Sequence, residues 1–587
     1  MKRLFLPIAV LLLLLSSVFS VPFAQDMEAP EGTWLGTWPY TLPPDHHLNA
    51  YASGGPNQNL GNQFRGMVEL TPAFYMWASN EYVGILAETW GFVDDNTAYE
   101  IKFREDALWS NGSQFDADDV VTTYELGRLA GWTQFNFIDV VEKVDDFTVR
   151  FHFIDGEPSL VAERLLLKDY IVADDTYGEF AVRAMELFAT EADSESEEWQ
   201  ALLVELQEFR PEELIATGPY TYSLDNVGDA FLTLSWQPNS IYSDTVNFGE
   251  LKLWAGETET TTPLVLSGEI AHATNVYPPS TIDTFVENGL EIVTVPRGYG
   301  PAMLFNLARE PWNIREVRQA VALVIERDQN AFLTNGFGAS GTQFMSGILD
   351  SMTPSLLSQE TIDQLDPWTF DTARAEELLE SVGYSRDGDG IWADADGNTL
   401  SAEWVFPQDF VDFAGATQDA VAQMNAFGFD ITLRALPWQE VPPIIREGSF
   451  DLSVWSWGAG NVLASRHFRN PVQRWVTELS DEQPGLAISL TELELADGTV
   501  VNLDEMINNV NNGLDTEAHR VAADEVALIL NSEMLFIPLN EMLSAEPFNT
   551  DVIAGLPAAD DPILRNPAGS DHFVIWMLLN GQLSPAG

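Results

Sequence analysis

The 587-residue chain contains no cysteine. This absence excludes disulfides, thiolate zinc sites, iron–sulfur clusters and cysteine catalysis, and it also removes the lipid-bearing cysteine that would tether a lipoprotein. A secreted chain of this length does not need disulfides, because it can bury a large apolar area. The length also exceeds what a single core supports, so two or more domains are expected.

Basic residues are scarce. Only 27 lysines and arginines, five of them lysines, accompany 90 acidic residues, which gives a formal net charge of −63. Such a field repels nucleic acid, so nucleic acid is excluded as a partner. The imbalance favours a solvated acidic surface, suited to high salt or to solubility, over a specific cation-binding role.

Long apolar runs are also rare, and the one present lies at the N-terminus. Two basic residues precede an apolar segment over 4–18, and small residues follow it. This pattern predicts a signal peptide over residues 1–24, with cleavage after Ser20 or Ala24. We therefore expect the mature protein in a periplasm or another cell-envelope space, and an uncleaved anchor is the alternative.

One segment combines three local signals. Apolar and charged residues alternate over 99–104, which predicts a half-buried strand. A tight-turn sequence, Asn111-Gly112, follows it. Asp116 then stands at a helix N-cap position, with Asp119 three residues later. The sequence therefore predicts a strand, a turn and a capped helix in close succession.

Further strands and helices follow in a regular order. Residues 216–220 read Ala-Thr-Gly-Pro-Tyr and predict a turn that opens a strand. A short apolar strand over 302–306 precedes an amphipathic helix over 314–327, on which Arg318 is expected to face the polar side. The segment 450–458 predicts another strand, which ends in Trp-Ser-Trp-Gly.

In their order and spacing, these segments resemble the family 5 extracytoplasmic solute-binding proteins, the binding components of ABC importers for oligopeptides, nickel and oligosaccharides. The resemblance is carried by residues 86–120, 216–220 with 302–327, and 450–458. It implies a protein that binds a solute and partners the transmembrane subunits of an ABC permease. It also implies no cofactor, no catalysed reaction and a monomer.

Alternating strands and helices predict an α/β fold. The resemblance adds a two-lobe, periplasmic-binding-protein-like topology of class II, cluster C type, with a hinge and an interlobe cleft. The implied division is lobe I over 27–298 with a subdomain at about 60–215, lobe II over 299–537, and a return to lobe I over 538–587. Chain crossings are expected near 297–306 and 535–539. A ligand would bind between the lobes and be trapped by hinge closure.

The loop after the 450–458 strand bears on the ligand. In peptide-binding members of the family, an aspartate shortly after this point pairs with the α-ammonium of the peptide. Here residues 459–466 contain no carboxylate, and a buried ammonium without a partner would be costly. Asn461 can instead exchange hydrogen bonds with a neutral polar ligand.

Tryptophan is abundant, with 18 in the chain, and an indole stacks well on the apolar face of a sugar ring. Trp455 and Trp457 share one face of a strand end by the period-two rule, so they are the first candidates for ligand contact. Further candidates are Tyr277, Tyr299, Asn57 and Asn59. A neutral oligosaccharide is the favoured ligand, and an oligopeptide is the alternative.

Other functions have weaker support. The many carboxylates and tryptophans suggest a secreted glycoside hydrolase as a distant alternative, but the sequence shows no nucleophile elbow, HExxH or phosphate loop. A purely structural acidic protein is a third possibility. His46-His47 is interpreted as an exposed loop pair, and no metal site is predicted. Residues 387–397 lack EF-hand spacing, so hairpin turns are favoured there over a calcium site.

Overall fold

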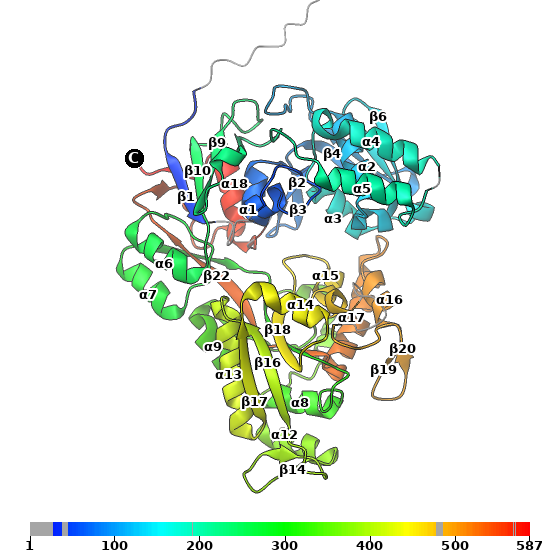
Figure 1. Ribbon diagram of the computed structural model, residues 1–587, viewed down its shortest axis with the longest axis vertical. Helices are drawn as coiled ribbons and strands as arrows, with labels where there is room; N and C mark the ends of the chain where they lie inside the picture. Colours follow the sequence, from blue (N-terminus) through cyan, green and yellow to red (C-terminus); the bar gives the residue numbers. More distant parts are fainter. Residues whose placement is uncertain (1–27, 38–44, 191, 477–484, 568, 570) are drawn as a thin grey trace, which may run out of the picture.

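The computed structural model describes residues 28–37, 45–190, 192–476, 485–567, 569 and 571–587. The predicted signal peptide lies outside these residues. The described chain forms two lobes, one above the other in Figure 1, and the C-terminus lies in the upper lobe. Within this part of the chain, no helix is both long enough and apolar enough to cross a membrane.

The first sheet of the upper lobe joins distant parts of the chain. Its order is β1-β10-β9-β8, in which β1 pairs parallel with β10 and the other pairs are antiparallel. The strands are β1 (Thr33–Thr37), β8 (Tyr220–Thr221), β9 (Phe231–Trp236) and β10 (Glu250–Trp254). The C-terminal helix α18 (Phe573–Leu579) belongs to the same hydrophobic core, so both chain ends stabilise this lobe.

The second sheet of the upper lobe contains the strand predicted over 99–104. Its antiparallel order is β4-β5-β7-β6. The strands are β4 (Ala87–Val93), β5 (Ala98–Phe103), β6 (Ile138–Asp145) and β7 (Thr148–Phe153). Helix α2 (Ala117–Leu129) begins after Asp116, which forms a capping box with Asp119. The predicted strand and capped helix are confirmed.

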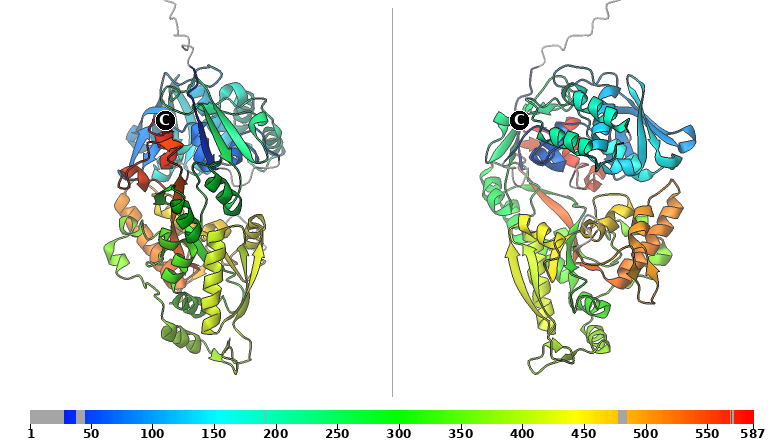
Figure 2. Two further views of the ribbon diagram at one scale, coloured as in Figure 1. Left: turned by 90° about the vertical axis from the view of Figure 1, so that its left-hand side faces the viewer. Right: turned by 45° about the vertical axis from the view of Figure 1, so that its right-hand side comes forward.

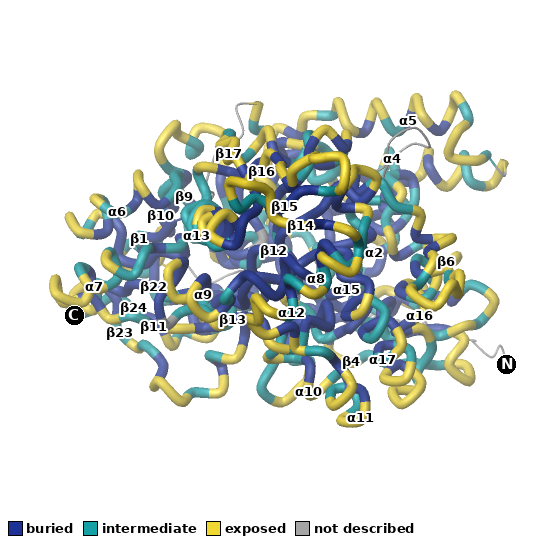
Figure 3. Tube along the Cα trace, turned by 90° about the horizontal axis from the view of Figure 1, so that it is seen from below, coloured by how far each residue is buried: buried dark blue, intermediate teal, exposed yellow. Residues whose placement is uncertain are grey.

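The lower lobe is built on a mixed five-stranded sheet of order β17-β16-β18-β12-β21. Strand β16 pairs parallel with β17 and β18, and β12 pairs antiparallel with β18 and β21. The strands are β12 (Gly300–Phe305), β16 (Ser401–Pro407), β17 (Asp430–Leu436), β18 (Leu452–Trp457) and β21 (Phe536–Pro538). All six residues of β12 are buried, and it lies at the centre of the view in Figure 3.

Helices cover this sheet on both sides, in agreement with the predicted alternation of strands and helices. They include α8 (Arg315–Val324), α12 (Thr372–Ser381), α13 (Val411–Phe427) and α17 (Thr516–Glu533). Residues of these helices and of the sheet share one large hydrophobic core, which is separate from the core of the upper lobe.

Two adjacent chain segments connect the lobes. Strand β22 (Asn540–Phe548) follows β21 after one residue, and β12 follows β11 (Glu291–Pro296) after three. Because β11 and β22 pair antiparallel, the two connections lie side by side (Figures 1 and 2). Their positions support a division of the chain near 298 and 537, and those boundaries stay a prediction.

Two local expectations need correction. Arg318 does not lie on an exposed polar face but is 5% exposed, because its guanidinium donates to the carbonyls of Trp312, Glu533 and Met534. It therefore joins α8 to the end of α17. His47 is also buried rather than exposed, and its ring hydrogen-bonds within its own loop.

The hairpin predicted over 387–397 is confirmed. Strands β14 (Ser385–Arg386) and β15 (Trp392–Ala393) pair antiparallel. In the intervening turn, the carboxylate of Asp387 accepts hydrogen bonds from the backbone N–H groups of Asp389 and Ile391, each at 2.9 Å. The aspartate thus shapes the turn by side-chain to backbone bonds.

Candidate functional site

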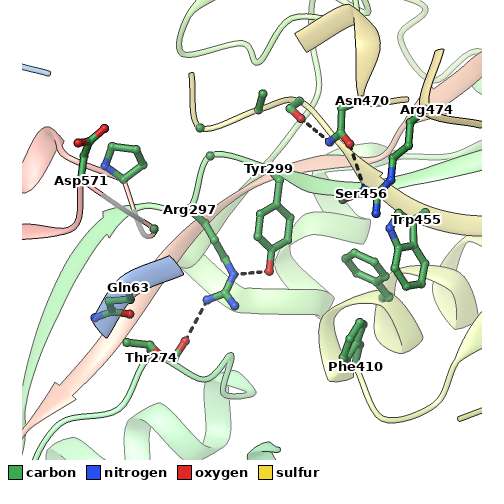
Figure 4. Close-up of a pocket in the computed structure, with 17 residues that line it drawn as sticks. Gln63, Thr274, Arg297, Tyr299, Phe410, Trp455, Ser456, Asn470, Arg474 and Asp571 are labelled. Carbon is green, nitrogen blue, oxygen red and sulfur yellow. Dashed lines mark hydrogen bonds between the residues drawn. The ribbon is translucent and has the colours of Figure 1, made fainter. Parts of the chain in front are cut away.

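A cavity of about 500 Å³ lies where the two lobes and the connecting segments meet (Figure 4). The upper lobe contributes side chains near α1 (Pro56–Phe64) and the C-terminal region. The lower lobe contributes the start of α13, the end of β18 and the residues that follow this strand. The lining includes Gln63, Thr274, Arg297, Tyr299, Phe410, Phe413, Trp455, Ser456, Asn470, Arg474 and Asp571. A solute held here would contact both lobes at once.

Aromatic side chains form the wall that belongs to the lower lobe. Trp455 lies two residues before the end of β18. Phe410 and Phe413 stand at the start of α13, and their ring centroids lie 6.2 and 6.0 Å from the indole. Tyr299, from the first connection, lies 6.4 Å from Phe413. In Figure 4, Trp455 and Phe410 lie on the opposite side of the cavity from Gln63 and Asp571, with Tyr299 between them. The wall offers apolar faces for stacking on a flat ligand.

The connecting segment itself lines the cavity. The guanidinium of Arg297 donates to the hydroxyl of Tyr299 at 2.6 Å and to the carbonyl of Thr274 at 3.2 Å (Figure 4). Gly298 has a φ of +77°, and a Cβ placed there would lie 2.7 Å from the Cα of Gly460. Glycine is therefore required at this point, both for the backbone angle and for the close approach of the loop after β18.

Polar groups occupy the remaining walls. Asn470 donates to the carbonyl of Gly458 at 2.6 Å and accepts from Arg474 at 3.3 Å. On the upper lobe, Asp571 accepts hydrogen bonds from Lys168 at 2.6 Å. The amide of Gln63 lies 2.9 Å from Nδ1 of a buried histidine. These groups are held in place before any ligand arrives, which lowers the entropy cost of binding.

Behind Gln63 lies a fully buried ionic cluster. Glu546 of β22 accepts from Nε2 of His272 at 2.7 Å and from Nε2 of His572 at 2.9 Å. Burial opposes ionisation of Glu546, but the two histidines outweigh it and hold the pKa of this carboxyl far below its usual range. Burial lowers the pKa of His272. The cluster connects the cavity wall to the interlobe strand β22.

A smaller cavity of about 80 Å³ adjoins the first beside Arg297 and is lined by two carboxyl groups. Burial raises the pKa of Glu257 to about 8, and it also raises the pKa of Asp412, against the opposing charge of Arg297. A protonated Glu257 carboxyl can donate a hydrogen bond at neutral pH. Among the described residues, no group of three or more histidines and carboxylates is arranged to hold a metal ion.

The sequence model of the bacterial extracellular solute-binding proteins, family 5 (middle region), matches residues 81–471, which is more than half of the chain. The chain belongs to this family. A periplasmic alpha-galactoside-binding protein of Rhizobium meliloti is 23% identical over 458 residues, which cover 68% of this chain and 61% of the relative. The glutathione-binding protein GsiB of Escherichia coli is 21% identical over 336 residues, which cover 55% of this chain and 58% of the relative. The chain thus spans about three fifths of the length of these curated relatives.

Solved structures resemble nearly the whole chain. The mannohexaose-bound periplasmic oligopeptide-binding protein of Thermotoga maritima matches with a TM-score of 0.72 at 16% identity, covering 96% of this chain and 99% of its own. NikA from Brucella suis, in complex with Fe(III)-EDTA, matches with a TM-score of 0.69 at 19% identity, covering 95% and 100%. The predicted α/β, periplasmic-binding-protein-like fold is confirmed.

Two residues predicted to bind ligand line the large cavity of this family 5 protein, namely Trp455 and Tyr299. Trp457 does not, although it shares a strand face with Trp455. Its partner on β12 is Gly300, and the indole fills the space beside this glycine and donates to the carbonyl of Asn540 at 2.9 Å. Trp457 is therefore fully buried against the start of β22.

The other predicted residues also lie away from this cavity. Tyr277 packs in a separate core, 4.8 Å from Phe285. Asn59 is fully buried and donates to the carbonyl of His47 and the hydroxyl of Tyr222, whereas Asn57 is exposed beside Arg65. Asn461 uses its side chain to accept from the backbone N–H of Leu463 at 3.0 Å, which shapes the loop after β18. Local partners thus engage the side-chain amide N–H groups of Asn59 and the side-chain oxygens of Asn57 and Asn461.

Sequence reasoning missed several groups that line the cavity, including Phe410, Phe413, Arg297, Asn470 and Arg474. For the two phenylalanines a signal was available. They lie just after β16 and three residues apart at the start of a helix, and ligands of α/β sheets bind beyond the carboxyl ends of strands. Arg297 and Asn470 carry no comparable local pattern.

Proposed function

We propose that this protein captures an oligosaccharide outside the cytoplasmic membrane and delivers it to the permease subunits of an ABC importer. The observation that carries the proposal is the aromatic wall of Trp455, Phe410, Phe413 and Tyr299 inside an interlobe cavity with polar groups opposite. A volume of about 500 Å³ suits a small ligand. A periplasm or another envelope space is the proposed location, and a monomer is the proposed state.

Closure of the two lobes about the hinge would tell the permease that a solute is bound. The cavity is lined from both lobes, so a solute that touches both stabilises the closed arrangement more than the open one. The paired strands β11 and β22 are the proposed hinge region, because both connections pass there. The permease would then recognise the closed form, and the solute would leave chemically unaltered.

Relatives support two solute classes. A mannohexaose-bound neighbour and an alpha-galactoside-binding relative favour an oligosaccharide. Oligopeptide is the second candidate, because a glutathione-binding relative is equally distant in sequence and because Asp571 and Arg474 place opposite charges in the cavity. The missing carboxylate over 459–466 and the aromatic wall favour the sugar.

A calorimetric and thermal-shift comparison tests the proposal. Di- to hexasaccharides and di- to pentapeptides are added to the mature protein, and each mixture is afterwards analysed by chromatography. We expect at least one oligosaccharide to raise the melting temperature, because a ligand that binds only the folded state stabilises it by mass action. We also expect that ligand to be recovered intact. Stabilisation by peptides alone, or products of hydrolysis, would contradict the proposal.

A further inference from the structure

A second interlobe cavity, of about 420 Å³, has a different chemistry from the first. Its upper wall comes from the 3₁₀ helix over 133–136 and from α3 (Leu160–Lys168). Its lower wall comes from α15 (Ala464–Arg469) and α16 (Leu503–Asn509). The lower-lobe helices lie directly below the upper lobe in Figure 1, on the side away from α6 (Thr258–Ser267) and α7 (Pro279–Glu287).

Arg466 contributes an unpaired positive charge to the lower wall of this second cavity. Among the described residues, its guanidinium has no hydrogen-bond acceptor and no carboxylate within ion-pair distance, in a chain with 90 acidic residues. Burial lowers the pKa of Arg466, and the charges of Arg469 and Arg164 lower it further. Elsewhere arginines of this chain meet carboxylates closely, as Arg150 meets Glu100 at 2.7 Å.

Arg164 brings positive charge from the opposite lobe. It belongs to α3, one turn beyond Val161 of the cavity wall, and it is 8% exposed. Its Nη2 donates to Asp571 at 3.3 Å, but Lys168 shares the same carboxylate. Its Nη1 is buried and has no hydrogen-bond partner among the described residues. An unsatisfied buried donor of this kind costs free energy until an acceptor arrives.

Among the described residues, the wall contains a single carboxylate, and it does not neutralise Arg466. Asp504 accepts from the side-chain amides of Gln473 at 2.8 Å and Asn508 at 3.1 Å, which engages both of its oxygens. No ion pair joins it to Arg466. The cavity therefore combines the unpaired charge of Arg466 with neutral hydrogen-bonding amides, a set of groups that suits an anionic partner.

We propose that this second cavity is a subsite for a carboxylate group of the transported solute, held by Arg466 of the lower lobe, with Arg469 in the same wall and the charge of Arg164 of the upper lobe behind the opposite wall. The proposal rests on the function proposed above and changes its ligand from a neutral to an acidic one. A uronic acid and the C-terminus of a peptide present the same carboxylate. Its charge would offset the repulsion between cations of opposite lobes, so it would favour closure.

Matched ligand pairs test this subsite by calorimetry. One pair is α-1,4-linked trigalacturonate and the neutral trisaccharide of galactose with the same linkage; the other is trialanine with a free or an amidated C-terminus. We expect the charged member of one pair to bind at least tenfold more tightly, and the pair that responds identifies the source of the carboxylate. Arg466→Gln should remove this preference while leaving the neutral member unchanged. The Arg183→Gln variant loses the same charge at an exposed position on α4 (Asp174–Phe188) and should keep the preference.

The unliganded protein supplies an independent readout. If Arg466 serves ligand binding and not stability, the Arg466→Gln substitution removes repulsion between like charges. The melting temperature of the unliganded variant should then equal or exceed that of the wild type. Equal binding of charged and neutral members, or a marked loss of unliganded stability in Arg466→Gln, would overturn the subsite. A preference for charged peptide over amidated peptide, with no saccharide bound, would refute the proposed sugar ligand but keep the subsite.

Discussion

The two interlobe cavities differ in what they present to a solute. The first is walled by Trp455, Phe410, Phe413 and Tyr299, and its ionic groups already have partners such as the pair of Asp571 with Lys168. The second lacks an aromatic wall of this kind and contains Arg466 without a counter-charge. One cavity is thus suited to a ring face and the other to a negative charge.

This difference shows where a strongly acidic protein places its few cations. A net charge of −63 repels anions at long range, and the arginines between the lobes work against that field at short range. Added salt screens the exposed surface more than a partly enclosed cavity. Charged-ligand binding should therefore persist at high ionic strength.

The variant with the largest expected effect lies between segments that line the two cavities, because His467 is next to Arg466 and accepts a hydrogen bond from the N–H of Ala459. His467 lies on α15 beside Arg466, its Nε2 donates to the carbonyl of Asn461 at 2.8 Å, and burial lowers its pKa to about 4. The imidazole of His467 binds a proton below about pH 6.5 in the unfolded chain but only below about pH 4 in the folded chain. The free energy of unfolding therefore decreases as the pH is lowered from about 6.5 to about 4. The histidine accounts for about 3 kcal/mol of that fall.

Urea unfolding at pH 7.5 and pH 4 measures this effect. The His467→Gln variant should lose less stability than the wild type over the same interval, by that amount. Carboxyl groups whose pKa is raised by burial, such as Asp119 with a pKa of about 7, change stability in the opposite direction, but they are present in both proteins and cancel in the difference. Equal pH dependence of the two proteins would refute the role of this histidine.

The next variant tests whether the hinge controls both cavities. Gly298→Ala places a Cβ against the Cα of Gly460 and forces a non-glycine residue to positive φ. We expect a loss of more than about 2 kcal/mol in unfolding free energy and weaker binding of every ligand. Gly289→Ala is the matched control, because Gly289 also has positive φ but open space around it. Calorimetry that cannot distinguish the two variants would contradict the close-approach argument.

The variant with the smallest predicted effect tests whether the two cavities act independently. Trp455→Ala should weaken sugar binding by more than about 1 kcal/mol, the scale of an aromatic contact. The charged and the neutral member of a sugar pair should lose the same binding free energy, because the first cavity does not distinguish charged from neutral sugars. Trp254→Ala on β10 of the upper lobe should leave binding unchanged, since it lies outside the cavity lining. An effect confined to the charged member would contradict this separation.

The sequence predicted local structure better than the site. Capping at Asp116 and the turn at Asp387 depend on neighbouring residues, and both were predictable. The face that Trp457 presents depends on Gly300 of another strand, and the burial of Arg318 depends on carbonyls at the far end of α17. Such partners are distant in sequence, so periodicity alone could place the strand and helix but not their contacts.

The environment of Arg466 could not be predicted from the sequence either. Its sequence context shows an arginine in a short helix, which is usually paired or solvated. Only the folded chain brings Arg469 and Arg164 near it and leaves its guanidinium without a carboxylate among the described residues. The neutral ligand favoured by residues 459–466 followed from a missing aspartate and carried no information on this cluster.

Small-angle X-ray scattering with and without a bound oligosaccharide tests the central claim most directly. If the two lobes close over an intact solute, the radius of gyration falls when ligand is added at saturation, and chromatography recovers the solute unchanged. An unchanged radius of gyration at saturation, or recovery of shorter saccharides, would contradict the account.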